Sequence, residues 1–433
     1  MLVGVILPDS KADPMDLLGE LRSLAKTAGA NVVDEITVRR HKPTPGLYVG
    51  TGKAEEIAQR VEQNSVDVVI FDNDLSPAQV RDLERIVKCK VLDRSELILD
   101  IFACHARTSE SRLQVELAQL EYTYPRLRHM WSHLERIAGG ATSAASAVGA
   151  IGTRGPGEKQ LEIDRRLVQK RVSHLKRQIK EIDERKVREV NGRKGTFSVC
   201  LVGYTNAGKS TMMRLMTGAD VYIADRLFAT LDTKTRRWTL DDGLEVLLSD
   251  TVGFVRDLPH HLVASFRATL EEAIGADLLI HVADASHDRV AQQVQAVEEV
   301  LDQLECGKGN RMLVLNKVDK INDPTVRAVL RKQYPEAVFA SAATGEGAEA
   351  IGAEVTNRAG GTAVPVTLRA NCRNGRLMQF LARYAKVESQ AFEDSTVQMN
   401  ARINRKALAD LAMFRPDVEV LSQPGSEIVA SRA

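Results

Sequence analysis

The chain has 433 residues and a formal net charge of +1. This length predicts two to four globular domains, and the balanced charge excludes a uniformly basic or acidic protein. No apolar run approaches the ~20 residues that a membrane-spanning helix needs. The five cysteines form no C-x-x-C pairs, which argues against a zinc site or a disulfide framework and favours a cytoplasmic protein.

Residues 1–112 alternate between strand-like and helix-like segments. Buried strands are predicted at 2–7, 31–38, 66–71 and 90–92, and helices at 14–28, 53–63, 76–88 and 95–103. This alternation predicts an N-terminal α/β domain with a mainly parallel sheet. Its Gly50-Thr51-Gly52-Lys53 lacks phosphate-loop spacing and has no D-x-x-G after it, so a strand-to-helix turn is favoured.

Residues 113–194 carry two heptad seams and predict an antiparallel helical hairpin. The first seam is Leu113, Leu117, Leu120, Tyr124, Leu127, Trp131 and Leu134; the second is Leu161, Val168, Val172, Leu175, Ile179 and Ile182. Pro125 is expected to kink the first helix. The glycine-rich connection at 138–157 has no apolar face, so we expect a mobile tip.

The hairpin is locally basic. From Arg126 to Lys194 the chain has 17 Lys and Arg against 8 Asp and Glu. Such charge is typical of a solvated coiled-coil surface. It is equally typical of an arm for RNA phosphates, with Arg154 at its tip.

The next motif, Gly203-Tyr204-Thr205-Asn206-Ala207-Gly208-Lys209-Ser210, matches the phosphate-binding pattern G-x-x-x-x-G-K-[ST]. An apolar run at 197–202 precedes it and a helical segment at 210–217 follows, so its backbone N–H groups can surround phosphates. Lys209 would reach the β- and γ-phosphates, and the Ser210 hydroxyl would bind Mg²⁺. The pattern predicts a nucleotide site.

Three further short motifs, two of four residues and one of three, follow predicted strands and indicate GTP. Asp250-Thr251-Val252-Gly253 puts a carboxylate near Mg²⁺ and a glycine N–H near the γ-phosphate. Asp319 of Asn316-Lys317-Val318-Asp319 can accept from guanine N1–H and N2–H₂, which adenine does not offer. Ser341-Ala342-Ala343 would place a backbone N–H near guanine O6.

Between these motifs, Phe228-Ala229-Thr230-Leu231-Asp232 is too polar for a core and predicts the first switch segment. Thr230 is the expected second Mg²⁺ hydroxyl, with Thr233 as the alternative. Phe254 stands where Ras-type GTPases have a water-orienting glutamine nearby, and its ring can neither donate nor accept. Arg256 or the first switch segment could orient the attacking water instead. Asn206 is either a turn former or a K⁺ ligand.

Residues 195–360 thus predict a P-loop GTPase domain, and residues 361–433 a small C-terminal α/β domain without visible chemistry. The predicted GTP-binding residues are Gly203, Tyr204, Thr205, Asn206, Ala207, Gly208, Lys209, Ser210, Thr211, Phe228, Ala229, Thr230, Leu231, Asp232, Asp250, Thr251, Val252, Gly253, Asn316, Lys317, Val318, Asp319, Ser341, Ala342 and Ala343. Among them, Lys209, Thr230 and Gly253 are the catalytic candidates, and Ser210, Thr230 and Asp250 are the metal candidates.

Several of these motifs resemble the HflX family of translational GTPases. They are G-Y-T-N-A-G-K-S-T, F-A-T-L-D, D-T-V-G-F-V-R-D-L-P and N-K-V-D, joined by L-D-R-S-E-L-I-L-D-I-F-A, L-Q-V-E-L-A-Q-L and R-G-P-G-E-K-Q-L-E-I-D-R-R. The resemblance spans about residues 45–360 and is less distinct at the C-terminus. Residues 141–150 look inserted relative to the family, where G-G-I-G runs directly into R-G-P-G-E.

The resemblance implies a cytoplasmic, monomeric GTPase that needs Mg²⁺, with K⁺ as a further cofactor on the Asn206 interpretation. It implies binding to the large ribosomal subunit and ribosomal RNA, and a part in ribosome splitting, recycling or rescue. An accessory GTPase of RNA modification or ribosome assembly is the alternative. Residues 1–190 show no cysteine nucleophile, metal cluster or second cofactor motif, which favours the ribosomal interpretation.

Overall fold

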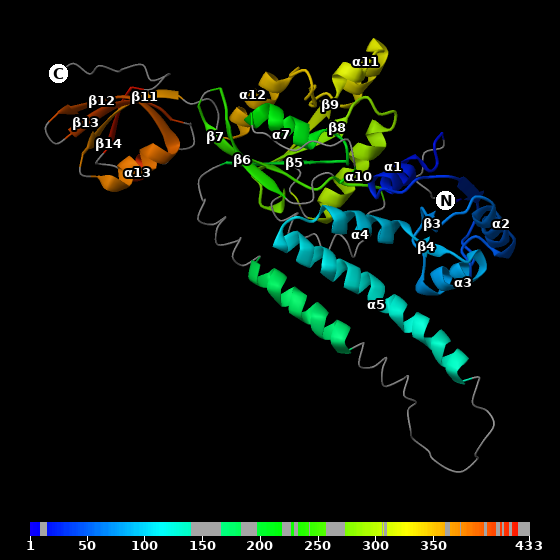
Figure 1. The fold of residues 1–433 in the computed structure, drawn as a ribbon. Helices are drawn as coiled ribbons and strands as arrows, with labels where there is room; N and C mark the ends of the chain where they lie inside the picture. The colour runs from blue at the N-terminus through cyan, green and yellow to red at the C-terminus, as the bar shows by residue number, and fades with distance from the viewer. Residues whose placement is uncertain are drawn as a thin grey trace.

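The computed structural model describes residues 1–8, 15–139, 166–182, 197–218, 227–228, 233–241, 243–256, 273–304, 306, 310–359, 364–372, 374–393, 396–403, 408, 411–414 and 418–422 (Figure 1). The predicted multidomain α/β architecture is confirmed, because the described residues form three separate sheets with helices packed on them. None of the helices within these ranges combines the length and apolar character that crossing a bilayer requires.

The N-terminal sheet consists of four parallel strands in the order β2-β1-β3-β4. They are β1 (Leu2–Ile6), β2 (Glu35–Arg39), β3 (Val68–Phe71) and β4 (Lys90–Leu92). Helices α2 (Thr51–Gln63) and α3 (Pro77–Val87) pack on one face of the sheet, and α1 (Gly19–Thr27) and α4 (Arg94–His105) on the other. Successive strand residues feed the two cores alternately, as the pleat requires.

Two predicted boundaries in this domain differ from the structure by four residues or more. Strand β2 begins at Glu35 rather than at residue 31, because the Asp34 side chain accepts from the Glu35 N–H (2.8 Å) and from Arg60 (3.3 Å). Helix α1 begins at Gly19 rather than at residue 14, after a turn closed by Gly19 N–H on the Asp16 carbonyl (3.3 Å). Gly50, with φ +84°, is the N-cap of helix α2.

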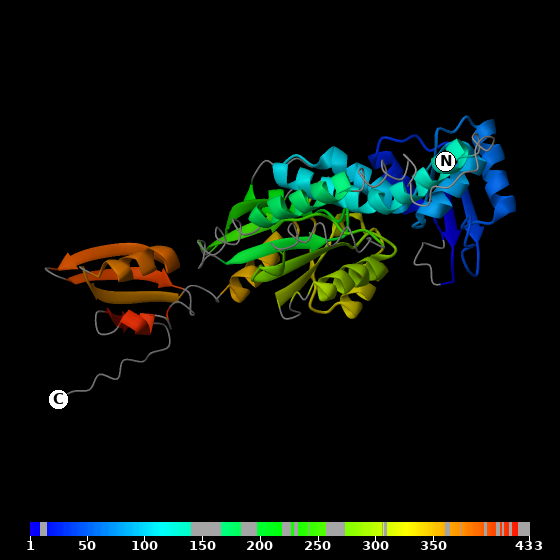
Figure 2. The same ribbon diagram turned by 90° about the horizontal axis from the view of Figure 1, so that it is seen from below.

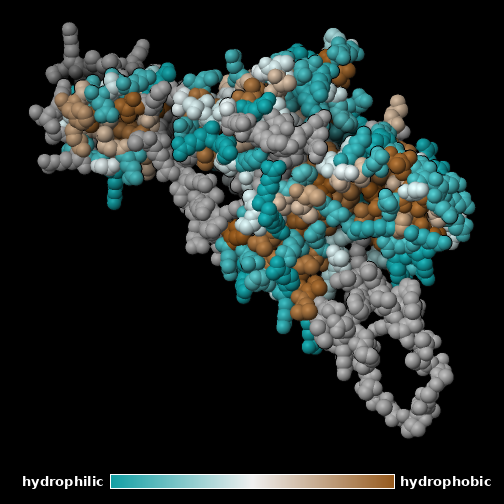
Figure 3. Space-filling view, in the orientation of Figure 1, coloured by the Kyte–Doolittle hydropathy of each residue, from teal (hydrophilic) through white to brown (hydrophobic). Residues whose placement is uncertain are grey.

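Helix α5 (Ser109–Gly139) is continuous through Pro125, and the helix at 166–182 runs back along it (Figure 1). Arg171 joins the two by a bidentate bond to Glu116 (2.7 and 2.8 Å), and Lys176 pairs with Glu121 (2.8 Å). Leu175 of the predicted seam is fully buried. Apolar side chains lie along the junction of the helices, flanked by hydrophilic ones (Figure 3). The glycine-rich connection and Arg154 lie outside the described residues.

The central sheet has six strands in the order β10-β9-β8-β5-β7-β6, parallel except for β6. They are β5 (Ser198–Gly203), β6 (Lys234–Thr239), β7 (Glu245–Asp250), β8 (Leu278–Asp284), β9 (Arg311–Asn316) and β10 (Val338–Phe339). Its helices are α7 (Lys209–Thr217), α10 (Val290–Gln303), α11 (Pro324–Gln333), α12 (Ala348–Arg358) and the 3₁₀ turn η2 (Val318–Lys320). In such sheets ligands bind beyond the carboxyl ends of the strands, which is where the predicted motifs lie.

The C-terminal sheet is antiparallel, in the order β12-β13-β11-β14. Its elements are β11 (Val364–Asn371), α13 (Gly375–Tyr384), β12 (Ala385–Glu393), β13 (Thr396–Ile403), η3 (Leu411–Phe414) and β14 (Val418–Ser422). Leu377 and Leu381 of α13 pack on its inner face. The N-terminal and C-terminal domains lie at opposite ends, with the six-stranded domain between them (Figure 2).

Candidate nucleotide-binding site

The phosphate-binding motif forms the turn between β5 and α7, and two of its glycines are sterically required. A Cβ on Gly203 would lie 2.1 Å from the Val282 carbonyl oxygen. A Cβ on Gly208, whose φ is +97°, would lie 2.3 Å from Asn316 Nδ2. A larger residue at either position would push the turn away from β8 or β9. Only glycine therefore fits at these two positions of the loop.

Lys209, the first residue of α7, is held by the loop that precedes it. Its Nζ donates to the carbonyl oxygens of Gly203 (3.1 Å) and Tyr204 (2.9 Å). Burial lowers the pKa of Lys209 to about 8, although the nearby Asp250 carboxylate opposes this shift. The ammonium is thus desolvated and fixed at the helix N-terminus, where triphosphate oxygens can replace its missing hydration.

Ser210 and Asp250 provide the oxygen donors expected for a metal ion. The Ser210 Oγ donates to Asp250 Oδ2 at 2.6 Å, and Asp250 is fully buried at the end of β7. A hydroxyl and a carboxylate are hard ligands that suit Mg²⁺, which takes its other ligands from phosphates and water. These two residues fit the ion. Thr230, the third predicted ligand, lies outside the described residues.

The D-T-V-G segment lies directly against the phosphate loop. A Cβ on Gly253 would lie 2.8 Å from Thr205 Cα and 3.0 Å from Lys209 Nζ. The Phe254 N–H donates to the Gly203 carbonyl (3.1 Å), and its carbonyl accepts from the Thr205 N–H (2.7 Å). These two bonds place Gly253 beside the ammonium that would meet the γ-phosphate.

The N-K-V-D and S-A-A motifs meet at the other end of the site. Asn316 donates to the Ala207 carbonyl (2.8 Å) and accepts from the Ala342 N–H (2.9 Å). Asp319 accepts from the Ser341 hydroxyl at 2.6 Å. The asparagine therefore joins this end to the phosphate loop, while Asp319 and the Ala342 backbone lie together where a base would be recognised.

One contributor to this end was missed from the sequence. Asp284, the last residue of β8, pairs with Lys317 at 2.7 Å and accepts from Ser286 N–H at 3.0 Å. Lys317 has φ +62°, an unusual conformation for a lysine. The position of Asp284 at a strand end beside two motif strands was the available signal.

The first switch segment is only partly described. Ala229, Thr230, Leu231 and Asp232 lie outside the described residues, whereas Phe228 and Thr233 lie within them. Phe228 has φ +55° and packs edge-on against Phe102 of α4, with ring centroids 4.6 Å apart. Of the remaining predicted residues, Thr211 lies in α7 and Ala343 directly follows Ala342.

Comparisons with known proteins cover most of the chain. Residues 15–103 match the family described as GTP-binding GTPase N-terminal, residues 105–193 its Middle Region, and residues 198–317 the family described as 50S ribosome-binding GTPase. The chain is 43% identical over 393 residues to GTPase HflX of Escherichia coli, with 90% of each chain covered. It is 42% identical to GTPase HflX of Magnetococcus marinus (88% and 86% covered). It is 37% identical to GTPase HflX of Lacrimispora saccharolytica (95% of each covered).

Proposed function

Because the chain belongs to the HflX family of GTPases, which bind and hydrolyse GTP, we propose that its GTP-bound form associates with the large ribosomal subunit. It would act there in splitting, recycling or rescue of ribosomes, as a cytoplasmic monomer. Hydrolysis to GDP and phosphate would end the association.

The residues at the sheet edge have distinct parts in hydrolysis. The loop N–H groups and the Lys209 ammonium bind the β- and γ-phosphates and stabilise negative charge that develops on them. Ser210 and Asp250, with Thr230, would hold Mg²⁺, which neutralises phosphate charge when bound. The Gly253 N–H would contact the γ-phosphate, so the position of its segment reports whether that phosphate is present.

The observation that carries the ribosomal proposal is a basic helix bound to α5 in a chain that also carries this GTP site. On the helix at 166–182, Arg166, Lys170 and Arg177 lie with Gln169, Ser173 and His174 along one shallow groove. Arg166, Lys170 and Arg177 are exposed. Lysines and arginines in such a row neutralise RNA phosphates and release counterions.

Sedimentation with purified large ribosomal subunits tests the proposal. We expect binding with a non-hydrolysable GTP analogue, weaker binding with GDP, and affinity that falls steeply with salt. The double variant Lys170→Gln/Arg177→Gln should bind more weakly and reduce the salt slope by about 1–2 units. Deleting residues 139–157 should weaken or misdirect binding and leave nucleotide affinity nearly intact.

A matched control removes the same charge elsewhere. Arg85→Gln/Lys88→Gln changes two exposed residues at the end of α3 and should leave ribosome affinity unaltered. Equal behaviour of the two double variants would show that the groove does not contact RNA. Sedimentation that ignores the nucleotide would instead support the accessory role in RNA modification or ribosome assembly.

A further inference from the structure

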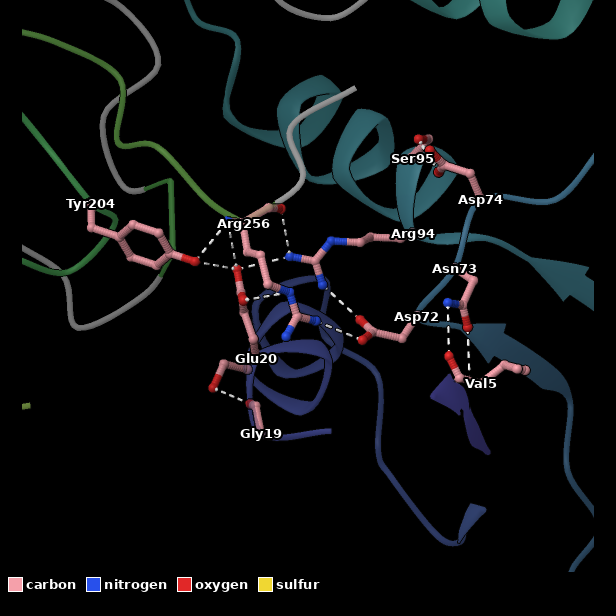
Figure 4. Close-up of polar contacts among 11 residues, drawn as sticks. Val5, Gly19, Glu20, Asp72, Asn73, Asp74, Arg94, Ser95, Tyr204 and Arg256 are labelled. Atoms are coloured by element: carbon pink, nitrogen blue, oxygen red, sulfur yellow. Dashed lines mark hydrogen bonds and ion pairs between the residues drawn. The ribbon is translucent and has the colours of Figure 1, made fainter. Parts of the chain in front are cut away.

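A cluster of charged side chains joins the N-terminal domain to the GTP site (Figure 4). Arg94, at the start of α4, binds Asp72 (2.6 Å) and Glu20 of α1 (2.8 Å). Arg256, three residues after Gly253, reaches across to Asp72 (2.7 Å). Tyr204 of the phosphate loop donates to Glu20 (2.9 Å). Two guanidiniums and two carboxylates thus neutralise one another at the domain boundary.

The cluster also binds the main chain of Arg256, in the segment that continues from D-T-V-G (residues 250–256, here called the second switch segment). The Arg256 N–H donates to Tyr204 Oη (2.6 Å) and to Glu20 Oε1 (3.2 Å). The Arg256 carbonyl accepts from Arg94 Nη2 (3.1 Å). Both peptide groups of one residue are therefore fixed by the N-terminal domain, directly or through Tyr204. Since Phe254 is fixed by the phosphate loop, Gly253 lies on a segment anchored at two points.

Apolar side chains of the N-terminal domain also contact both switch segments. Val252 and Val255, on either side of Gly253, belong to the buried cluster formed by α1 and α4. Phe228, from the first switch segment, belongs to the same cluster and meets Phe102 edge-on. One helix, α4, therefore contacts both segments that bracket the γ-phosphate position.

The ionic groups of the cluster are largely removed from solvent, with Glu20 the most exposed at 20% and Arg256 at 13%, so each depends on its partners. The Arg94 side chain is 3% exposed and that of Asp72 is 7% exposed. Burial opposes ionisation of Glu20, but Arg94, Arg256 and the Tyr204 hydroxyl hold its pKa below the usual range. A buried charge that loses a partner is strongly disfavoured, so removal of one carboxylate must loosen the whole cluster.

We propose that Glu20 is a positioning residue for the γ-phosphate: through Tyr204 and the Arg256 main chain it holds the Gly253 N–H in place for GTP. GDP has no γ-phosphate and gains nothing from this hold. Affinity for GTP is thereby coupled to docking of α1 and α4. Because such coupling is reciprocal, a partner that shifts these helices changes GTP affinity by the same factor.

The test compares two nucleotides on one folded protein. In the full-length chain with Mg²⁺, Glu20→Gln should weaken binding of a non-hydrolysable GTP analogue by about tenfold and leave GDP affinity within about twofold. Titration calorimetry gives both values. The matched control is Glu35→Gln. Glu35 accepts two hydrogen bonds from Arg22 of α1 (2.6 and 2.7 Å), and among the described residues no hydrogen bond joins Glu35 to either switch segment. It should change neither affinity.

A second variant keeps the proposal testable if Glu20→Gln does not fold. Tyr204→Phe removes one hydroxyl and should reduce the ratio of GTP-analogue affinity to GDP affinity. The double variant Glu20→Gln/Tyr204→Phe should lose less binding free energy for the analogue than the sum of the two single losses. Equal loss of affinity for both nucleotides would mean that the cluster only supports the fold. An unchanged ratio, or tighter binding of the analogue, would also overturn the proposal.

Discussion

At the scale of single residues, Asp319 is the predicted acceptor for the base at one end of the site. The Ser341 hydroxyl donates to its Oδ1 at 2.6 Å, and η2 begins directly before it. The carboxylate is therefore oriented before a base arrives. A site built around fixed acceptors discriminates strongly against a base that cannot donate to them.

We predict that Asp319→Asn weakens GTP binding by well over tenfold and gives xanthosine triphosphate a relative advantage. The amide presents a donor opposite N2, where xanthine carries an oxygen and guanine a donor. Competition between the two nucleotides measures the ratio. Unchanged GTP affinity would remove Asp319 from base recognition.

The residues predictable from the sequence are those whose spacing alone states a task. Lys209, Asp250 and Asp319 each stand in a short motif that follows a strand, and the fold brings these motifs to one edge of the sheet. Glu20 was not predictable, because its role depends on Tyr204 and Arg256, which lie about 180 and 240 residues away along the chain. Short motifs can be recognised because their residues are close together in the sequence. Contacts between domains join residues far apart in the sequence and produce no periodic pattern.

At the scale of elements, the D-T-V-G segment is tied to the core by Phe254. Its side chain is 3% exposed and packs with Val202 of β5, Leu279 of β8 and Val297 of α10. The ring therefore points into the sheet layer rather than toward the phosphates. A phenylalanine here anchors the segment, and its replacement by a polar residue would bury an amide among apolar groups.

We predict that Phe254→Gln does not accelerate GTP hydrolysis and lowers the free energy of unfolding by about 3 kcal/mol. Phe254→Leu is the matched control, which should cost less stability because it stays apolar. Urea unfolding and phosphate release measure the two effects. Faster hydrolysis by the glutamine variant would show that this position faces the attacking water.

Element boundaries show where sequence patterns have limited reach. Strand β4 was predicted to the residue, since the apolar run and the strand have the same ends. Strand β2 was predicted too long, because the apolar pattern does not register the side-chain turn at Asp34. Strands β12 and β14 were not predicted, since their exposed faces and mixed composition give little periodicity.

At the scale of the whole molecule, the N-terminal domain packs against the segments of the GTP site, and the basic helix is bound to α5, which packs against that domain. The N-terminal domain contacts both switch segments through α4, and the basic helix at 166–182 is bound to α5 of the same part of the chain. Ala118 of α5 and Phe102 of α4 share one buried cluster with Phe228 and Val252, so packed side chains connect α5 to both switch segments. On the proposed function, RNA bound at the basic helix would be coupled to the nucleotide state through these contacts.

This arrangement predicts slow turnover by the isolated protein. Phe254 is buried in the core, and the Arg256 guanidinium is bound to Asp72 at 2.7 Å, so neither side chain is placed to orient the attacking water. We expect a rate far below the roughly 1–10³ s⁻¹ typical of enzymes, and acceleration by large ribosomal subunits that order the switch segments. The rate should be measured with and without subunits, in potassium and in sodium. Faster turnover in potassium would assign Asn206, whose φ is +60°, to a cation site, and equal rates would leave it a turn former. Fast hydrolysis by the protein alone in sodium would contradict the prediction, because it would require a catalytic group already in place.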